Sequence, residues 1–260
     1  MAGVLVLQRD SGAGSGSDAA SAGPDDPVLD AKMRRLVFYD WEPNVIGPSG
    51  RPAPGDPAVT GGVSAGRAGG LSLYDAVLRA ARRPPAVEAD NARTTTLYYA
   101  VDRAHRRVFG HGAPSRTQAL AAVPAAPRRA VRIYEVKPGT AIVHAEGAAD
   151  HWYVLEDDVA LRGSEIRDPR RARDPITGRP VIVFSFTEAG RARFKALTLA
   201  IARRGAASSL ERVSDDPAVH NQHFAVVYEG KIVTAAFLDF RRNPDGVDPK
   251  AGSQLSAQLP

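Results

Sequence analysis

The side chains best suited to chemistry include a pair of histidines with carboxylates beside them. His220 and His223 form an H-x-x-H spacing, and Asp215 and Asp216 precede them. Imidazole and carboxylate groups together are ligands that zinc and related ions accept. No helical pattern frames this pair as in H-E-x-x-H sites. We therefore expect solvated loop histidines here and no metal site.

A second acidic group, Glu156-Asp157-Asp158, follows a predicted strand. Oxygen ligands of this kind suit divalent ions, but the spacing of a calcium-binding loop is missing, so the sequence predicts a solvated turn. The chain has no cysteine, which excludes thiolate chemistry and cysteine-based metal sites. No G-x-S-x-G motif is present either. These observations predict a protein that is not an enzyme and that uses no cofactor.

Two aromatic side chains, Tyr39 and Trp41, stand beside Asp40 and Glu42 at the end of a predicted strand. Aromatic residues are enriched among the residues that dominate protein interfaces. Tyr39 and Trp41 are therefore the candidate contact residues for a partner or client. The alternative is that they close the strand end onto the core.

The chain is basic, with a net charge of +5 and a pI near 9.7. Such a charge favours attraction to anionic surfaces, or reflects the arginine-rich usage of a GC-rich genome. Aromatic and basic residues do not alternate as in single-strand binders, and no helix-turn-helix or zinc-finger spacing occurs. We therefore expect no nucleic-acid partner. No apolar run of about 18 residues occurs, so no membrane span is predicted.

Low-complexity sequence fills residues 9–26 and predicts a flexible linker. Residues 2–7 are apolar and are either the end of an anchor helix or a strand. Residues 48–70 are rich in glycine and proline and predict a long loop. Their glycines match neither phosphate-binding pattern, so no phosphate site is expected.

The clearest structural pattern runs from residue 180 to residue 240. The β-branched and aromatic run at 181–186 predicts a strand. Thr187 is placed to cap a following helix, and Gly205 is the expected stop of that helix. Two strands, 224–228 and 232–238, are predicted around a tight Glu229-Gly230 turn. The stripe expected to face the core consists of Gly190, Phe194, Leu197 and Ile201.

Shorter elements precede this unit. The pattern predicts a helix at 73–83, which Ser72 caps and which has Tyr74, Val77, Leu78 and Ala81 on one face. A second helix is predicted at 115–122, and a type II turn at 137–140. Strands are predicted at 36–39, 94–101, 108–109, 131–136, 140–145 and 152–155. The predicted fold class is α+β, a mixed or antiparallel sheet packed against a few helices.

Three ordered tracts resemble one family. They are ALRGSEIRD (residues 160–168), RDPITGRPVIVFSFTEAGRARFKALT (173–198) and FAVVYEGKIVTAAFLDF (224–240), followed by NPDGVDPKAGSQLS (243–256). Together they resemble the large periplasmic domain of SecD, a protein-export membrane protein, in its actinobacterial form. The resemblance extends over residues 31–256, with residues 1–30 as a linker and 257–260 as a tail.

The resemblance implies a SecD-like head domain that either lies on the extracytoplasmic face of the cell membrane or is secreted. It implies contact with unfolded preproteins during export, with SecF and the SecYEG channel as further partners. Membrane association would then come only through segments outside this chain. The family segments like "GLDLxGG" and "RVDxLGVxEP" are missing here, so the resemblance is to the head alone, as a stand-alone relative or part of a longer protein. The alternative function is a cell-envelope adaptor that docks on a membrane or partner without binding clients.

Overall fold

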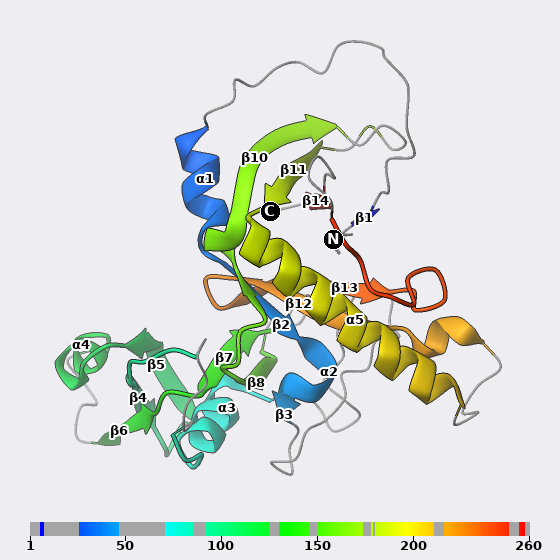
Figure 1. Cartoon of the computed structure of the whole chain (residues 1–260). Helices are drawn as coiled ribbons and strands as arrows, with labels where there is room; N and C mark the ends of the chain where they lie inside the picture. Colours follow the sequence, from blue (N-terminus) through cyan, green and yellow to red (C-terminus); the bar gives the residue numbers. More distant parts are fainter. Residues whose placement is uncertain are drawn as a thin grey trace. The chain divides into compact units, whose positions relative to one another are not determined.

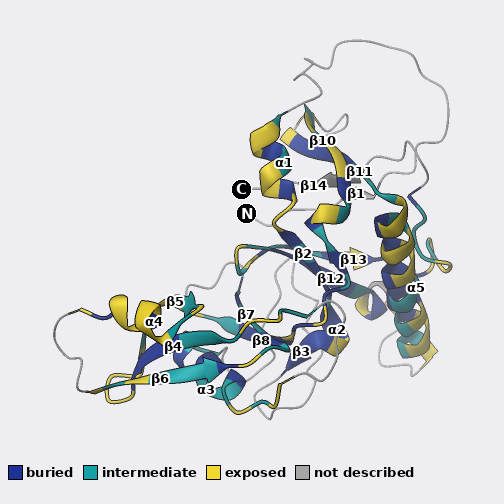
Figure 2. Ribbon diagram, turned by 60° about the vertical axis from the view of Figure 1, so that its left-hand side comes forward, coloured by how far each residue is buried: buried dark blue, intermediate teal, exposed yellow. Residues whose placement is uncertain are grey.

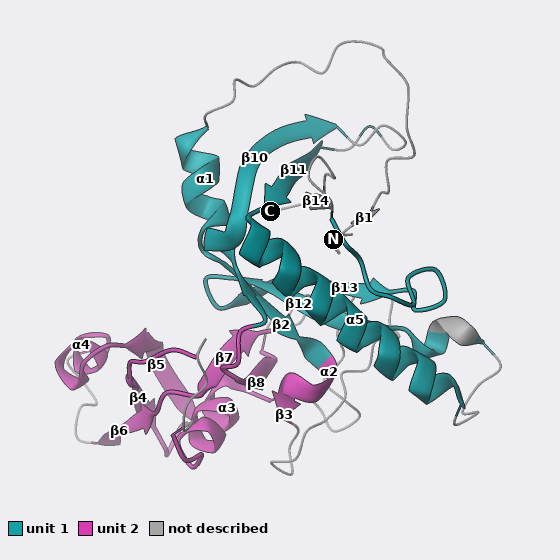
Figure 3. Cartoon of the chain, in the orientation of Figure 1, with its two compact units in different colours: residues 1–41, 57–63, 160–260 teal, residues 42–56, 64–159 magenta. Residues whose placement is uncertain are grey.

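The computed structural model describes residues 6–7, 26–46, 71–85, 92–124, 130–145, 150–173, 178, 180–210, 216–249 and 255–257. Two compact units make up the chain (Figure 3). Unit 1 comprises residues 1–41, 57–63 and 160–260, and unit 2 comprises residues 42–56 and 64–159. The sequence predicts one domain over residues 31–256, so this division is an addition from the structure. The predicted loop at 48–70 and residues 9–25 of the predicted linker lie outside the described residues.

Unit 1 contains two antiparallel sheets and a 23-residue helix, α5 (Figure 1). Its helices are α1 (Pro27–Met33) and α5 (Glu188–Leu210), with short 3-10 helices at Gly163–Glu165 and Pro217–His220. One sheet has the order β1 (Val6–Leu7), β14 (Leu255–Ala257), β11 (Pro180–Phe186), β10 (Ile166–Arg173). The other strands of the unit follow the order β13 (Lys231–Leu238), β12 (Gln222–Tyr228), β2 (Leu36–Asp40), β9 (Leu161–Arg162).

Unit 2 is built from two small antiparallel groups of strands. One has the order β3 (Val45–Ile46), β8 (Trp152–Glu156), β7 (Thr140–His144), and the other has the order β5 (Arg107–Ala113), β4 (Leu97–Asp102), β6 (Val131–Val136). α3 (Leu73–Ala80) shares a core with side chains of both groups, and α4 (Arg116–Ala121) packs on the other face of the β5-β4-β6 sheet. α2 (Trp41–Asn44) begins at the last residue of the first segment of unit 1.

The α+β prediction is confirmed, and α5 is the element around which unit 1 packs. Thr187 accepts a hydrogen bond from the Gly190 N–H at 3.0 Å, so it caps the helix as predicted. The predicted stripe of Gly190, Phe194, Leu197 and Ile201 is buried. Figure 2 shows this buried stripe beside exposed positions on the same helix.

The predicted end of this helix at Gly205 is wrong, because α5 continues to Leu210. Gly205 is buried, and a Cβ there would lie 2.9 Å from the Phe240 ring and 3.0 Å from the His220 carbonyl oxygen. The glycine therefore serves close packing rather than termination. Tertiary contact outweighs the intrinsic preference that favours a stop.

The core of unit 1 is aromatic. The Phe194 ring lies 5.1 Å from Phe186 and 5.9 Å from Phe224, between centroids, and Phe224 stacks on Phe38 at 6.3 Å. Such offset and edge-to-face pairs add to the free energy gained by burying the rings. The helix, β11 and the β12–β2 pair are thereby joined through one cluster of rings.

The hairpin between β12 and β13 is confirmed. Glu229 and Gly230 have φ of 50° and 76°, the left-handed pair that a tight two-residue hairpin turn requires. The type II turn at 137–140 is also consistent with the structure, since Gly139 has φ of 98°.

Several predicted boundaries need correction. Residues 27–30 belong to α1, which Asp26 caps by accepting the Leu29 N–H at 3.0 Å, so the linker does not extend through residue 30. Val6–Leu7 pairs with β14, which agrees with the strand alternative for that part of residues 2–7. α3 ends at Ala80, and β4 begins at Leu97. The buried face of α3 is Tyr74, Ala76, Val77 and Ala80, in place of the predicted Leu78 and Ala81.

Candidate functional site

The two aromatic candidates, Tyr39 and Trp41, lie in the core. Tyr39 is 5% exposed and Trp41 is 1% exposed. Tyr39 is in β2, where it pairs with Ala225 of β12. The structure therefore agrees with the alternative in which both side chains close the strand end onto the core. Contact with a client stays a prediction, and it would require this strand end to open.

The histidine pair is not solvated, contrary to the sequence prediction. His220 and His223 are both buried, and His220 Nδ1 lies 3.1 Å from Ser208 Oγ of α5. Among the described residues, no three His, Asp or Glu side chains gather as metal ligands would. His220 ends the 3-10 helix that precedes β12, and its ring contacts Ser208 of α5. The side chain is therefore part of the packing of unit 1.

The acidic turn after β8 is also more buried than predicted. Asp157 is buried and accepts the Arg93 N–H at 2.8 Å, and Glu156 pairs with Arg83 at 3.1 Å. Arg93 also donates to the Thr140 carbonyl at 2.8 Å. Asp157 thus ties the segment before β4 to the β7–β8 pair. Glu156 and Asp158 are exposed, as expected for a solvated turn, and only Asp157 of the three is buried.

The family-like tract at 160–168 packs against the start of α5. A Cβ on Gly163 would lie 1.9 Å from the Met33 carbonyl oxygen, so only glycine fits. The Glu165 carboxylate accepts the Arg162 N–H at 3.0 Å and pairs with Arg193 of α5 at 3.3 Å. The tract therefore packs β9 and β10 against the start of α5.

The segment after β13 also packs against α5. Thr198 Oγ1 accepts the Val247 N–H at 2.8 Å and donates to the Phe194 carbonyl at 2.8 Å. Asp248 pairs with Arg191 at 2.7 Å and with Lys195 at 3.4 Å. The hydrogen bond from Arg191 is the main reason that the pKa of Asp248 lies below its ordinary value and that the pKa of Arg191 is raised. These contacts hold the segment against α5, and they do not position a side chain for a chemical reaction.

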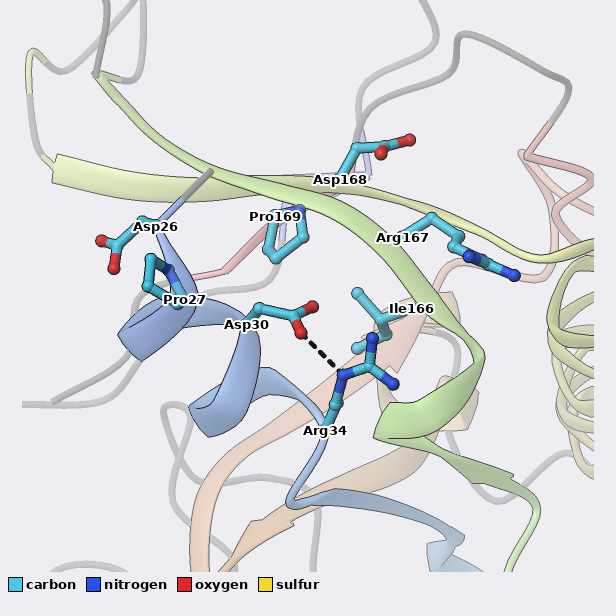
Figure 4. Close-up of a pocket in the computed structure, with 8 residues that line it drawn as sticks. All are labelled: Asp26, Pro27, Asp30, Arg34, Ile166, Arg167, Asp168 and Pro169. Atoms are coloured by element: carbon cyan, nitrogen blue, oxygen red, sulfur yellow. Dashed lines mark hydrogen bonds and ion pairs between the residues drawn. The ribbon is translucent and has the colours of Figure 1, made fainter. Parts of the chain in front are cut away.

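A pocket of about 570 Å³ lies between α1 and β10 (Figure 4). In Figure 4, Ile166 and Pro169 lie on the α1 side of β10, whereas Asp168 points away from the helix. Arg34 pairs with Asp30 at 2.6 Å across the helical turn. The lining residues are Asp26, Pro27, Asp30, Arg34, Ile166, Arg167, Asp168 and Pro169.

One ion pair joins the two walls of this pocket. Arg171 of β10 lies 3.4 Å from Asp26. The pKa of Asp26 is lowered, first by the hydrogen bond from the Leu29 N–H and then by Arg171. Both side chains of this pair are partly exposed, so the pair contributes little to stability.

β10 is the edge strand of its sheet. It pairs with β11 from Ile166↔Phe186 to Arg173↔Pro180, and no other described strand pairs with it. The register shifts between Arg167 and Arg170, where Asp168 has φ of 51° and Pro169 lacks an N–H. An open edge presents unpaired N–H and C=O groups that can receive another extended chain.

Neither this edge nor the pocket was predicted from the sequence. The tract IRDPRRAR shows no alternation of apolar and polar residues, so it carries no strand signal. Helix α1 did have a readable signal, because an aspartate followed by proline is a common helix start. With α1 recognised, the sequence would have placed a helix before β2, but not the strand beside it.

Residues 140–242 match the family model described as SecDF, P1 head subdomain. No curated protein and no solved structure matches the chain. The matched range includes β7 to β13 and α5, and it begins after the β5-β4-β6 sheet. In the described part of the chain, no helix is both long enough and apolar enough to cross a membrane.

Proposed function

We propose, from the premise that residues 140–242 are a SecDF P1 head subdomain, that this chain holds unfolded segments of exported proteins at the edge of β10. The family is a protein-export accessory, and its P1 head lies on the extracytoplasmic side of the membrane. The single observation that carries the proposal is the open edge of β10 beside the α1 pocket.

An exported chain in transit is extended, and its backbone groups lack partners. Addition to a strand edge satisfies those groups whatever the side-chain sequence, which suits a protein that must accept many clients. The pocket of about 570 Å³ would take occasional side chains of the added segment. Main-chain pairing would supply affinity, and the pocket would supply modest preference.

The arginines of β10 restrict what the edge accepts. Arg167, Arg170, Arg171 and Arg173 are exposed along eight residues. Like charges placed opposite one another destabilise a strand pair, so two copies of this edge would repel each other. Neutral or acidic client segments would be favoured, and self-association through β10 would be suppressed.

Site-specific photo-crosslinking tests the proposal. A photoreactive residue replaces Arg170 on β10 in one variant, and Arg203 on α5 in the matched control, since both are exposed arginines. Each is irradiated with a reduced and carboxymethylated polypeptide that cannot refold. We expect strong crosslinking from position 170 that an excess of unlabelled unfolded chain competes away, and little from position 203. Equal or absent crosslinking at the two positions would contradict the proposal.

The buried aromatic pair can be tested in the same reaction. The chain has two tryptophans, and Trp152→Phe leaves Trp41 as the single reporter. If a client reaches Tyr39 and Trp41, its addition should shift Trp41 emission to longer wavelength, because a buried indole would become hydrated. An unchanged spectrum with productive crosslinking at 170 would limit the contact to β10.

SecF and the SecYEG channel are the further partners that we propose for the head. Vesicles that contain SecYEG, with and without SecF, should retain the chain, whereas protein-free vesicles of the same lipid should retain less. Equal retention by the SecYEG-containing vesicles and by the protein-free vesicles would exclude a specific partner contact under those conditions.

A further inference from the structure

The positive charge of the chain is concentrated in one segment. Residues 92–136 contain eight arginines, no lysine and two acidic residues, Asp102 and Glu135, which gives a net charge of +6. The whole chain carries +5, so the remaining residues sum to −1. This segment forms the β5-β4-β6 sheet and lies outside the family match. Charge asymmetry of this kind indicates a polyanionic partner.

Four exposed arginines of this segment gather at one end of the sheet. Arg103, His105 and Arg106 are exposed in the turn after β4, and Arg107 begins β5 opposite Asp102. Arg132 of β6 is exposed and pairs with Val101, the residue before Asp102. The three strands therefore bring these side chains to a common end. We call Arg103, His105, Arg106, Arg107 and Arg132 the basic end.

The acidic residues nearby are already engaged. Asp102 is buried and accepts the Ala104 N–H at 2.9 Å and lies 2.8 Å from His105 Nδ1. Glu135 pairs with Arg116. Within the described residues, Arg103, Arg107 and Arg132 have no ion-pair partner, so their charges stay uncompensated.

The turn is also held in place before any partner arrives. Arg106 has φ of 49°, packs over the Tyr74 ring at 4.7 Å, and pairs with both carboxylate oxygens of Asp75 at 2.7 and 2.9 Å. Arg107 lies over the Phe109 ring at 5.1 Å. Fixed side chains lose less conformational freedom on binding than free ones.

We propose that the basic end docks on a membrane surface rich in anionic phospholipid. Its charges are exposed and spread over the turn after β4 and the strands β5 and β6, which suits an extended layer of phosphates better than one small anion. The extracytoplasmic location of the P1 head family places membrane lipid within reach. Each arginine near an anionic surface is expected to strengthen binding about fivefold, and salt weakens the attraction by screening it.

Vesicle co-sedimentation of the full chain tests this proposal. The probes are phosphatidylcholine vesicles with and without phosphatidylglycerol. The test variant combines Arg103→Gln, Arg107→Gln and Arg132→Gln, and the control combines Arg167→Gln, Arg170→Gln and Arg203→Gln, with the same loss of charge in unit 1. We expect binding only with phosphatidylglycerol, weakened roughly 100-fold in the test variant and only a few-fold in the control.

Three outcomes would overturn the proposal. Equal losses in both variants would show a general effect of net charge. Equal binding to both vesicle types would show that the phosphate charge is not recognised. Salt-sensitive binding of a short RNA, with no binding to phosphatidylglycerol vesicles, would assign the basic end to nucleic acid. Thermal melts of both variants should stay close to the parent, because none of the six arginines has an ion-pair partner among the described residues. The test variant loses only the contact of Arg107 with the Phe109 ring, which at an exposed site is worth about 0.5–1 kcal/mol. Crosslinking at position 170 is read separately, so failure here leaves the client proposal standing.

Discussion

Unit 1 and the β5-β4-β6 sheet of unit 2 are stabilised and charged in different ways. In unit 1, phenylalanine rings and glycines meet in close contact around α5, and the family-like tracts coincide with those contacts. In the β5-β4-β6 sheet, two small cores flank the strands, and arginines lie over Tyr74, Tyr98 and Phe109 at the surface. Most of the recognisable motif residues therefore serve packing, whereas the net positive charge lies in residues 92–136, outside the motifs.

The largest expected effect is on the aromatic core. Phe194→Ala should lower the free energy of unfolding of unit 1 by about 3–5 kcal/mol, because this ring is 0% exposed. Trp41 belongs to unit 1 and Trp152 to unit 2, so urea unfolding of the Trp152→Phe background follows unit 1. Phe237→Ala, at a position 59% exposed, is the control and should change stability by less than about 0.5 kcal/mol. A parent-like midpoint for Phe194→Ala would mean that α5 does not organise unit 1.

A smaller effect is expected from the hydroxyl that joins α5 to the segment after β13. Thr198→Val keeps the side-chain shape but leaves the Val247 N–H without its acceptor, which should cost about 1–3 kcal/mol. Thr198→Ser keeps the hydroxyl and should retain most of the stability. Urea unfolding measures both. Equal losses in the two variants would show that the methyl group, and not the hydrogen bond, matters.

The turn between β12 and β13 should respond less. Gly230→Val places a β-branched residue at φ of 76°, which should cost about 1–2 kcal/mol. Lys231→Val, one residue later in β13, avoids the left-handed region and serves as the control. If both variants unfold at the same urea concentration, the left-handed turn contributes nothing measurable.

The smallest effect compares one carboxylate in each unit. The pKa values of Asp248 and Asp102 are both lowered, mainly by hydrogen bonds from Arg191 and His105 respectively. A lowered pKa in the folded state adds stability above the unfolded value near 3.8 and loses it as pH falls through the folded pKa. Asp248→Asn should flatten the acid loss of stability in unit 1, and Asp102→Asn should do so in unit 2. Thermal melts between about pH 5 and pH 2 measure both slopes.

The parts that sequence predicted well are those with strong local patterns. The α5 stripe and the β12–β13 hairpin followed from periodicity and from Gly230, and both are present. The end of α5 was mispredicted because Gly205 meets Phe240, a contact across 35 positions that no local pattern encodes. The burial of His220 and Asp157 likewise depends on Ser208 and Arg93.

The candidate site was the least predictable part. β10 is a strand through its pairing with β11, although half of its own residues are arginine. Tyr39 and Trp41 could be assigned by type either to an interface or to a core, and only their neighbours decide. The charge of residues 92–136 was readable from the sequence, but its gathering at one sheet end required the strand register.

The pairing of β1 with β14 has a mechanical consequence. In this antiparallel pair, Val6 lies opposite Ser256 and Leu7 opposite Leu255, so the outward ends of both strands leave on the same side. Tension applied between the two ends of the chain would pull this pair in the unzipping geometry. The hydrogen bonds would then be loaded one after another, and not all together as in shear. The pair would therefore yield at low force, before the load reached the ring cluster around Phe194.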